Sequence, residues 1–228
     1  MIITNAQLTG QTTQHISSLS ARVGIHHDLH APWLALQQAA QMAGFELTIA
    51  SGFRTFERQL TIWNNKFSGA TPVFDQHNQP VDFSLLSILE KIHAIMLYSA
   101  LPGASRHHWG TDIDVYAANL LPAEQTLQLA TWEYQLDGPF AQLSEWLQHH
   151  ASEFGFYFPY DRFRGGIAEE PWHLSYYPLA TYFESQLNEV LLYDCLAASN
   201  IQGKQTILAN LTDIYQRFII NISETPNA

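Results

Sequence analysis

Residues 105–114 read SRHHWGTDID and hold the densest polar chemistry of the chain. The histidines come before Gly110, and the aspartates come after it. Because histidine and aspartate are both zinc ligands, an imidazole before a glycine turn and a carboxylate on the next strand can converge on one ion. We therefore expect a strand over residues 112–116 with part of a metal site beside it, although a local hydrogen-bonding network would also fit this segment alone.

A catalytic zinc site needs three protein ligands and an open position, so a further ligand must come from elsewhere. Residues 170–173, EPWH, offer a histidine and, three positions earlier, a glutamate. A zinc hydrolase also needs a base for its water, and a glutamate serves that purpose. The chain contains no His-Glu-x-x-His, which excludes the helical zinc proteases that carry this pattern.

A third segment, SGFR at residues 51–54, follows a run over 46–50 that alternates as a short strand does. Thr55 can cap a helix that continues through Phe67. Arg54 is one of only ten lysines and arginines in an acidic chain. A guanidinium recognises a carboxylate with paired hydrogen bonds, so this arginine is a candidate for binding an anionic group.

The remainder of the chain mixes predicted helices with a few short strands. Helices are expected over residues 31–43, 84–100, 140–152, 180–198 and 203–216. Residues 68–82, with Gly, Pro, Asn and Asp, predict a surface loop, and the aromatic residues 155–159 predict a strand. Because strands and helices do not alternate regularly, this order predicts an α+β fold in one domain, residues 1–228, with a helical C-terminal extension.

The composition narrows the classes of partner. The formal net charge is −11 with neutral histidines, which disfavours nucleic acid and anionic membranes. One locally basic pocket for an anionic small substrate is compatible with this charge. Cys195 is the single cysteine, so no intramolecular disulfide can form, and its apolar neighbours predict a small buried side chain.

The first residues, MIITNAQ, lack the positive start and the apolar core of a secretory signal. No run approaches the roughly 20 apolar residues of a membrane span. We therefore expect a cytoplasmic protein without a membrane partner, provided that Met1 is the natural start. The sequence leaves the oligomeric state and the role of the C-terminal helices open.

Together the three segments resemble a known family. Ser-x-His-x-x-Gly-x-x-x-Asp at 105–114, followed by Glu-x-x-His at 170–173, is similar to the signature of the VanY-type D-alanyl-D-alanine and L,D-carboxypeptidases. These are LAS metallopeptidases of peptidase family M15. The upstream Ser-Gly-Phe-Arg, with Gln59 five residues after Arg54, matches the arginine motif of that family. Order and spacing agree over about residues 30–178.

The resemblance implies a small antiparallel sheet flanked by helices around one zinc ion (Zn2+). The catalytic core would cover about residues 30–178 and the helical extension about 179–228. The implied zinc ligands are His107, Asp114 and His173, and the implied catalytic base is Glu170. The implied substrate-binding residues are Arg54, Gln59 and Ser105, of which Arg54 would also stabilise the developing oxyanion.

The function that the resemblance implies is removal of the terminal D-alanine from peptidoglycan stem peptides. We favour an L,D-carboxypeptidase that trims tetrapeptides to tripeptides in cytoplasmic murein recycling, because a D,D-carboxypeptidase there would destroy the pentapeptide precursors of the wall. A D,D-carboxypeptidase is the alternative. A phage-type wall endopeptidase would usually carry a basic surface or a wall-binding module. A non-catalytic wall-peptide-binding module would bind without turnover, although all the expected catalytic residues are present.

Other histidines and carboxylates compete for these roles. The family spacing selects against the neighbours His108, Asp112 and Glu169. Asp112 stands where the family often has small or apolar residues, and we expect it to hydrogen-bond a ligand or the backbone. HHDLH at 26–30 and EKIH at 90–93 also contain possible ligands. The first is expected to be exposed or to cap a helix, and the second to lie on the face of an amphipathic helix.

Overall fold

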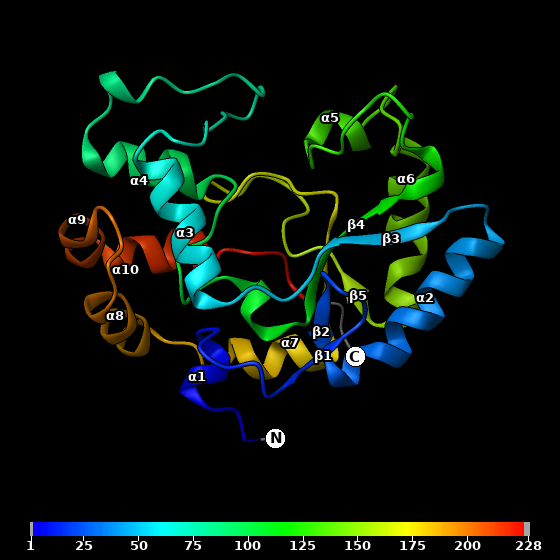
Figure 1. Ribbon diagram of the computed structural model, residues 1–228, viewed down its shortest axis with the longest axis horizontal. Helices are drawn as coiled ribbons and strands as arrows, with labels where there is room; N and C mark the ends of the chain where they lie inside the picture. Colours follow the sequence, from blue (N-terminus) through cyan, green and yellow to red (C-terminus); the bar gives the residue numbers. More distant parts are fainter. Residues whose placement is uncertain (1, 226–228) are drawn as a thin grey trace.

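The computed structural model describes residues 2–225, and Met1 lies outside this range. Its centre is a four-stranded antiparallel sheet (Figure 1). In spatial order the strands are β3 (Leu47–Ser51), β4 (Asp112–Ala117), β6 (His173–Tyr176) and β5 (Phe156–Tyr157). Two short strands, β1 (Ile16–Ser18) and β2 (Gly24–His26), form a separate antiparallel pair. The predicted α+β fold with a small antiparallel sheet is confirmed.

Helices flank the sheet on both sides, and the described residues form two large apolar cores and a smaller one around Trp109 and Phe183. On one side, α2 (His30–Met42) and α6 (Ala141–His150) pack the apolar residues of β3 and β4. Ile113 and Val115 of β4 are fully buried there. Their neighbours along the strand, Asp112 and Asp114, point to the opposite face because side chains alternate along a strand. The same alternation that builds the core therefore places two carboxylates on the functional face.

The second core lies between the central helices and the C-terminal segment. Its helices are α3 (Phe56–Phe67), α4 (Ile88–Met96), α8 (Glu189–Ala198), α9 (Lys204–Ala209) and α10 (Leu211–Ile214). Trp63 of α3 is fully buried in it, and its indole Nε1 donates to the Gln202 carbonyl oxygen at 3.0 Å. The C-terminal helices therefore complete the core beside α3 and α4. Three further helices are α1 (Asn5–Leu8), α5 (Thr131–Tyr134) and α7 (Tyr177–Glu184).

Short helical turns link these elements. Turns of 3-10 type cover His27–Leu29, Phe83–Leu85, Arg106–Trp109, Ala118–Leu120 and Ala151–Phe154, and a π-helical turn covers Tyr215–Ile219. None of the helices within residues 2–225 is long and apolar enough to cross a membrane.

Helix caps decide where the predicted helices begin. The side chain of Thr55 accepts a hydrogen bond from the Arg58 backbone N–H, as expected for the start of α3. The helix predicted over 84–100 was too long: Ser87 and Glu90 form a capping box, so α4 begins only at Ile88. Two C-terminal helices were predicted, over 180–198 and 203–216, but the structure has four in this region. Asn188 caps a separate α8, and Asn210 separates α9 from α10.

Candidate active site

The register of the sheet brings the predicted metal ligands together. Asp114 of β4 pairs directly with His173 of β6. His107 lies in the 3-10 turn before β4, which ends at Gly110 with φ 68°. A Cβ at Gly110 would lie 2.7 Å from the backbone nitrogen of His26, so glycine is required there by conformation and by space. Because the chain reverses at Gly110, the His107 imidazole lies beside the first residues of β4.

Asp114 lies between the two imidazoles. Its Oδ2 is 3.3 Å from His107 Nε2, and its Oδ1 is 3.2 Å from His173 Nδ1. The ring centroids of the two histidines are 5.0 Å apart. All three side chains are buried, and their ligand atoms lie within 4.8 Å of one another. Sequence positions up to 66 residues apart thus form one group that can hold a metal ion.

The hydrogen bonds around this group leave its inner atoms free for an ion. Among the described residues, Asp114 Oδ1 is a buried acceptor without a hydrogen-bond partner. Although His173 Nδ1 is near, the two atoms do not point at each other as a donor and an acceptor do. The Nδ1–H of His107 donates to the Gly52 carbonyl oxygen at 2.9 Å, which leaves Nε2 as a lone-pair donor toward Asp114. The donor set and its orientation fit zinc.

Three carboxylates surround His173. Besides Asp114, Glu170 Oε2 lies 3.4 Å from its Nδ1, and Asp112 Oδ1 lies 3.1 Å from its Nε2. Burial opposes a charged imidazole, but the three neighbouring carboxylates raise the pKa of His173 well above its usual value. Burial likewise opposes ionisation of Asp114, yet His107 and His173 hold its pKa well below the usual range. The local field therefore favours a cation at this point.

Arg106 supports this arrangement from the same face of the sheet, and the sequence patterns did not indicate that role. Its Nε donates to Asp112 Oδ1 at 2.6 Å, and its other nitrogens bind Ser175, Tyr157 and Glu184. Asp112 also accepts from the Thr111 hydroxyl at 2.7 Å. Asp112 is thereby held in place and in turn fixes the Nε2–H of His173, as predicted for a supporting residue.

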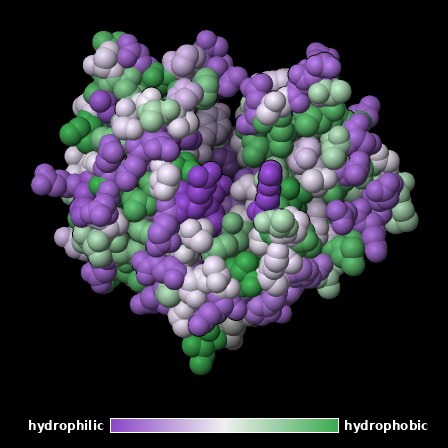
Figure 2. Space-filling model, viewed as in Figure 1, coloured by the Kyte–Doolittle hydropathy of each residue, from purple (hydrophilic) through white to green (hydrophobic). Residues whose placement is uncertain are grey.

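A cleft of about 920 Å³ opens above the triad, and Asp114 and Trp172 form part of its lining. The loop of residues 71–78 lines one side, and residues 128–135 around α5 line the other. The surface is hollowed between these two segments, with hydrophilic side chains at its base (Figure 2). The cleft therefore gives a ligand access to Asp114.

Arg54 lines the same cleft as Asp114. Its Nη1 donates to Gln59 Oε1 at 2.8 Å, and its Nη2 donates to Ser51 Oγ at 3.0 Å. Burial lowers the pKa of Arg54, while the charges of Asp114 and Glu170 oppose this shift. Gln59 is fully buried behind the guanidinium, and its amide donates to the Ala100 carbonyl oxygen at 2.7 Å. The predicted partners Arg54 and Gln59 therefore meet, with Arg54 facing the cleft.

Ser105 lies away from the cleft lining. It is buried at the start of the 3-10 turn, where its carbonyl oxygen accepts from the His108 N–H at 3.0 Å. His108 is buried as well, with its Nδ1–H donating to the Arg54 carbonyl oxygen at 2.6 Å. The structure thus gives Ser105 and His108 contacts with the turn that carries His107 and with the backbone of Arg54.

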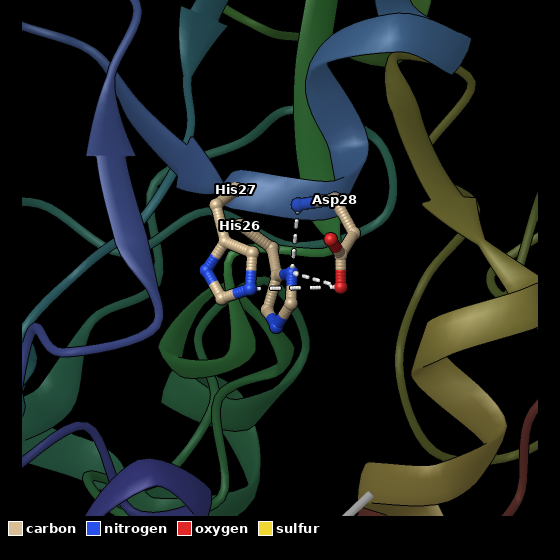
Figure 3. A group of neighbouring side chains, drawn as sticks. All are labelled: His26, His27 and Asp28. Atoms are coloured by element: carbon tan, nitrogen blue, oxygen red, sulfur yellow. Dashed lines mark hydrogen bonds and ion pairs between the residues drawn. The ribbon is translucent and has the colours of Figure 1, made fainter.

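The competing segments lie elsewhere. His26, His27 and Asp28 form a second cluster of possible ligand atoms at the end of β2 (Figure 3). His26 Nδ1 accepts from the Asp28 N–H at 3.2 Å, so His26 caps a helical turn as expected. Glu90 belongs to the cap of α4, and His93 packs beside Phe218 with ring centroids 5.3 Å apart.

Comparison with known proteins agrees with this geometry. The sequence model of the VanY family, D-alanyl-D-alanine carboxypeptidase, matches residues 22–179, more than half of the chain. The chain belongs to this family. The predicted enzyme class is thereby confirmed at the level of the family, and the buried His-Asp-His group could hold the predicted metal ion.

Individual relatives were found by sequence. An uncharacterised protein of Haemophilus influenzae is 37% identical over 122 residues, which are 53% of this chain and 93% of that protein. The putative carboxypeptidase YodJ of Bacillus subtilis is 26% identical over 143 residues, 60% of this chain and 41% of that protein.

Solved structures share the fold. VanYB in complex with D-alanine-D-alanine matches with a TM-score of 0.53 at 20% identity, over 81% of this chain and 89% of that chain. The VanY D,D-pentapeptidase of a VanB-type vancomycin resistance cassette, solved with Zn(II), matches with a TM-score of 0.51 at 23% identity, over 77% and 88%. At these identities the comparison extends to the fold, and the roles of single residues are argued from this chain.

Proposed function

We propose that this protein is a zinc carboxypeptidase that removes the terminal D-alanine from peptidoglycan stem peptides. The observation that carries the proposal is the convergence of His107, Asp114 and His173 beside Glu170, at the base of a cleft that Arg54 lines. His107, Asp114 and His173 would hold the ion. When bound, zinc supplies Lewis acidity for the scissile carbonyl and for water.

The position of the Glu170 carboxylate supports a role in transferring the proton of the attacking water. It is buried, and its carboxylate lies 3.4 Å from His173. It would therefore lie next to a ligand of the bound ion. In the proposed reaction it accepts a proton from the attacking water and delivers that proton to the leaving amine. This role keeps Glu170 outside the set of metal ligands, so its removal should affect turnover and spare metal binding.

Arg54 recognises the free end of the peptide in this proposal. A guanidinium offers five N–H donors, and two of its nitrogens are oriented here by Gln59 and Ser51. The remaining donors can bind the terminal carboxylate or the developing oxyanion. Gln59 then acts by orienting Arg54, and Ser105 by starting the turn that presents His107.

The bond that is cut is a separate part of the proposal. We favour the L,D bond before a single terminal D-alanine, in cytoplasmic recycling, because D,D activity in that compartment would consume wall precursors. The D,D alternative has its own support, since the family is described by D-alanyl-D-alanine cleavage and VanYB was solved with D-alanine-D-alanine. Substrate length separates the two.

The test is mass spectrometry of zinc-loaded protein with a muropeptide tetrapeptide and, separately, a pentapeptide. Each peptide is also supplied with its C-terminus amidated. The Glu170→Gln variant is compared with Glu169→Gln, which changes a half-buried carboxylate one residue away. Zinc content is measured in every sample.

We expect loss of one alanine from the tetrapeptide, a fall in rate of about 10²- to 10⁴-fold in Glu170→Gln, and full zinc content in both variants. Cleavage of the pentapeptide alone would replace the L,D assignment with D,D activity. Undiminished turnover by Glu170→Gln would overturn the assignment of the base. Equal cleavage of amidated peptides would indicate an endopeptidase, and binding without cleavage a wall-peptide-binding module.

A further inference from the structure

A second cation lines the cleft, and the proposed reaction does not use it. Lys66 lies near the C-terminal end of α3, and its Nζ donates to Ser99 Oγ at 2.6 Å. Both residues line the same cavity as Arg54 and Asp114. Sequence patterns alone did not single out Lys66, although it lies seven residues after Gln59 and thus on the same face of the helix.

The charge of Lys66 is not neutralised within the protein. Among residues 2–225, the ion pairs of lysine and arginine belong to Arg106 and Arg164. Asp114 is the one carboxylate among the described residues that line the cleft, and it faces the two histidines. Burial lowers the pKa of Lys66, and the charge of Glu170 opposes that shift. A half-buried ammonium is costly unless an anion approaches it, and the open cleft is where an anion can enter.

The two cationic positions are spaced along α3. Gln59 orients Arg54 at one end, and Lys66 lies two helical turns further on. Seven residues of α-helix rise about 10 Å, which separates the backbone positions of Gln59 and Lys66. Besides burial, the charge of Arg54 contributes to the lowered pKa of Lys66, so the two cations act on the same part of the cleft. A ligand that bridges them therefore needs two anionic groups that can reach both side chains.

We infer that Lys66, together with Ser99, binds a second carboxylate of the stem peptide while Arg54 holds the terminal one. This inference rests on the proposed function and adds a preference for the peptide's interior residues. In an extended tetrapeptide, roughly 10 Å separates the terminal carboxylate from two others. One ends the side chain of diaminopimelate in the third position, and the other is the α-carboxylate of the γ-linked D-glutamate.

The same geometry selects against some peptides. L-Lysine in the third position ends in an ammonium, which would meet the like charge of Lys66. Diaminopimelate also ends in an ammonium, but the carboxylate on the same carbon balances that charge and can pair with Lys66. The structure thus favours a diamino dicarboxylic acid over L-lysine before the terminal D-alanine.

The experiment measures kcat/KM for alanine release from four peptides of the length that the wild type cuts. They contain diaminopimelate, diaminopimelate with its side-chain carboxylate amidated, L-lysine, or diaminopimelate with the D-glutamate α-carboxylate amidated. The wild type is compared with Lys66→Met and with Arg58→Met. Arg58 is an exposed cation of the same helix, so it controls for the loss of charge.

We expect Lys66→Met to lower kcat/KM for the diaminopimelate peptide about 10- to 100-fold, with little change for the peptide that lacks the recognised carboxylate. Arg58→Met should leave the ratios between peptides unchanged. The amide that loses activity in the wild type identifies which of the two carboxylates Lys66 binds.

Equal kcat/KM of the wild type for all four peptides would overturn the inference, as would an equal loss on all four in Lys66→Met. Thermal unfolding shows whether Lys66→Met folds. If it does not, the inference is tested by the wild type alone, by comparing kcat/KM for the diaminopimelate peptide with kcat/KM for its two amidated forms. Cleavage of none of the four peptides would overturn the proposed function and the inference with it, whereas equal cleavage overturns the inference alone.

Discussion

Within residues 2–225, two groups of histidine and aspartate side chains bring possible metal ligands together, and they are built in different ways. The 26–28 group consists of consecutive residues at the end of β2 (Figure 3). The central triad, His107, Asp114 and His173, comes from a turn and two neighbouring strands. The distance between ligand atoms does not distinguish the two groups, because in both of them these atoms lie within 4.8 Å of one another.

Burial and hydrogen bonding do separate them. In the 26–28 group, Asp28 and His27 are 52% and 55% exposed, and His26 Nδ1 already accepts a backbone hydrogen bond. In the triad all three side chains are buried, and Asp114 Oδ1 has no hydrogen-bond partner among the described residues. A buried acceptor left without a partner is costly, so a bound ion explains the triad, whereas the 26–28 group is satisfied without one.

The largest expected effect removes the metal itself. His173→Ala should reduce bound zinc from about one ion per chain to near zero, because three protein ligands are the minimum of a catalytic zinc site. His27→Ala should keep full zinc content. Metal analysis after dialysis, together with thermal unfolding with and without chelator, measures both. Loss of zinc from His27→Ala, with zinc retained in His173→Ala, would reverse the roles of the two groups.

A weaker effect is expected from the residue that supports the triad. Asp112→Asn keeps the size of the side chain but weakens its hydrogen bond to His173 Nε2, and such supporting changes cost about 10- to 100-fold in metal affinity. Competition with a chromogenic chelator gives the zinc Kd. Asp28→Asn is the matched control in the 26–28 group and should leave the Kd unchanged. An unchanged Kd in Asp112→Asn would show that Arg106 and Asp112 serve the fold alone.

The smallest effect concerns pH and the one buried member of the 26–28 group. Burial, followed by the charges of His27 and His15, lowers the pKa of His26 to about 4. The unfolded chain therefore binds a proton near pH 6.5 that the folded chain excludes, so His26 lowers stability as pH falls from about 6.5 to 4. His26→Gln should flatten the fall of the urea midpoint over this window. His27→Gln, at an exposed position, should not; an identical slope in all three proteins would contradict this account of His26.

Local sequence predicted the elements that depend on local chemistry. Thr55 begins α3 by capping it, and the alternation of residues 112–116 became β4. The prediction was wrong where a second local signal competed with periodicity. Ser87 caps α4 inside the apolar run of residues 84–100, and Asn188 starts a new helix inside 180–198. Capping free energy outweighed continuity of the apolar face at both places.

By itself the sequence indicated which chemistry this protein carries, because the order and spacing of His107, Asp114, Glu170 and His173 resemble the motifs of one family, and such motifs can be read along the chain. Only the tertiary structure decided which of the two histidine groups lacks internal hydrogen-bond partners, and which cations face the cleft. Lys66 becomes a candidate for specificity because α3 packs beside Ser99 and leaves its charge without a carboxylate among the described residues. Burial and pairing of a charge depend on residues distant in the sequence, and only the packed chain brings them together.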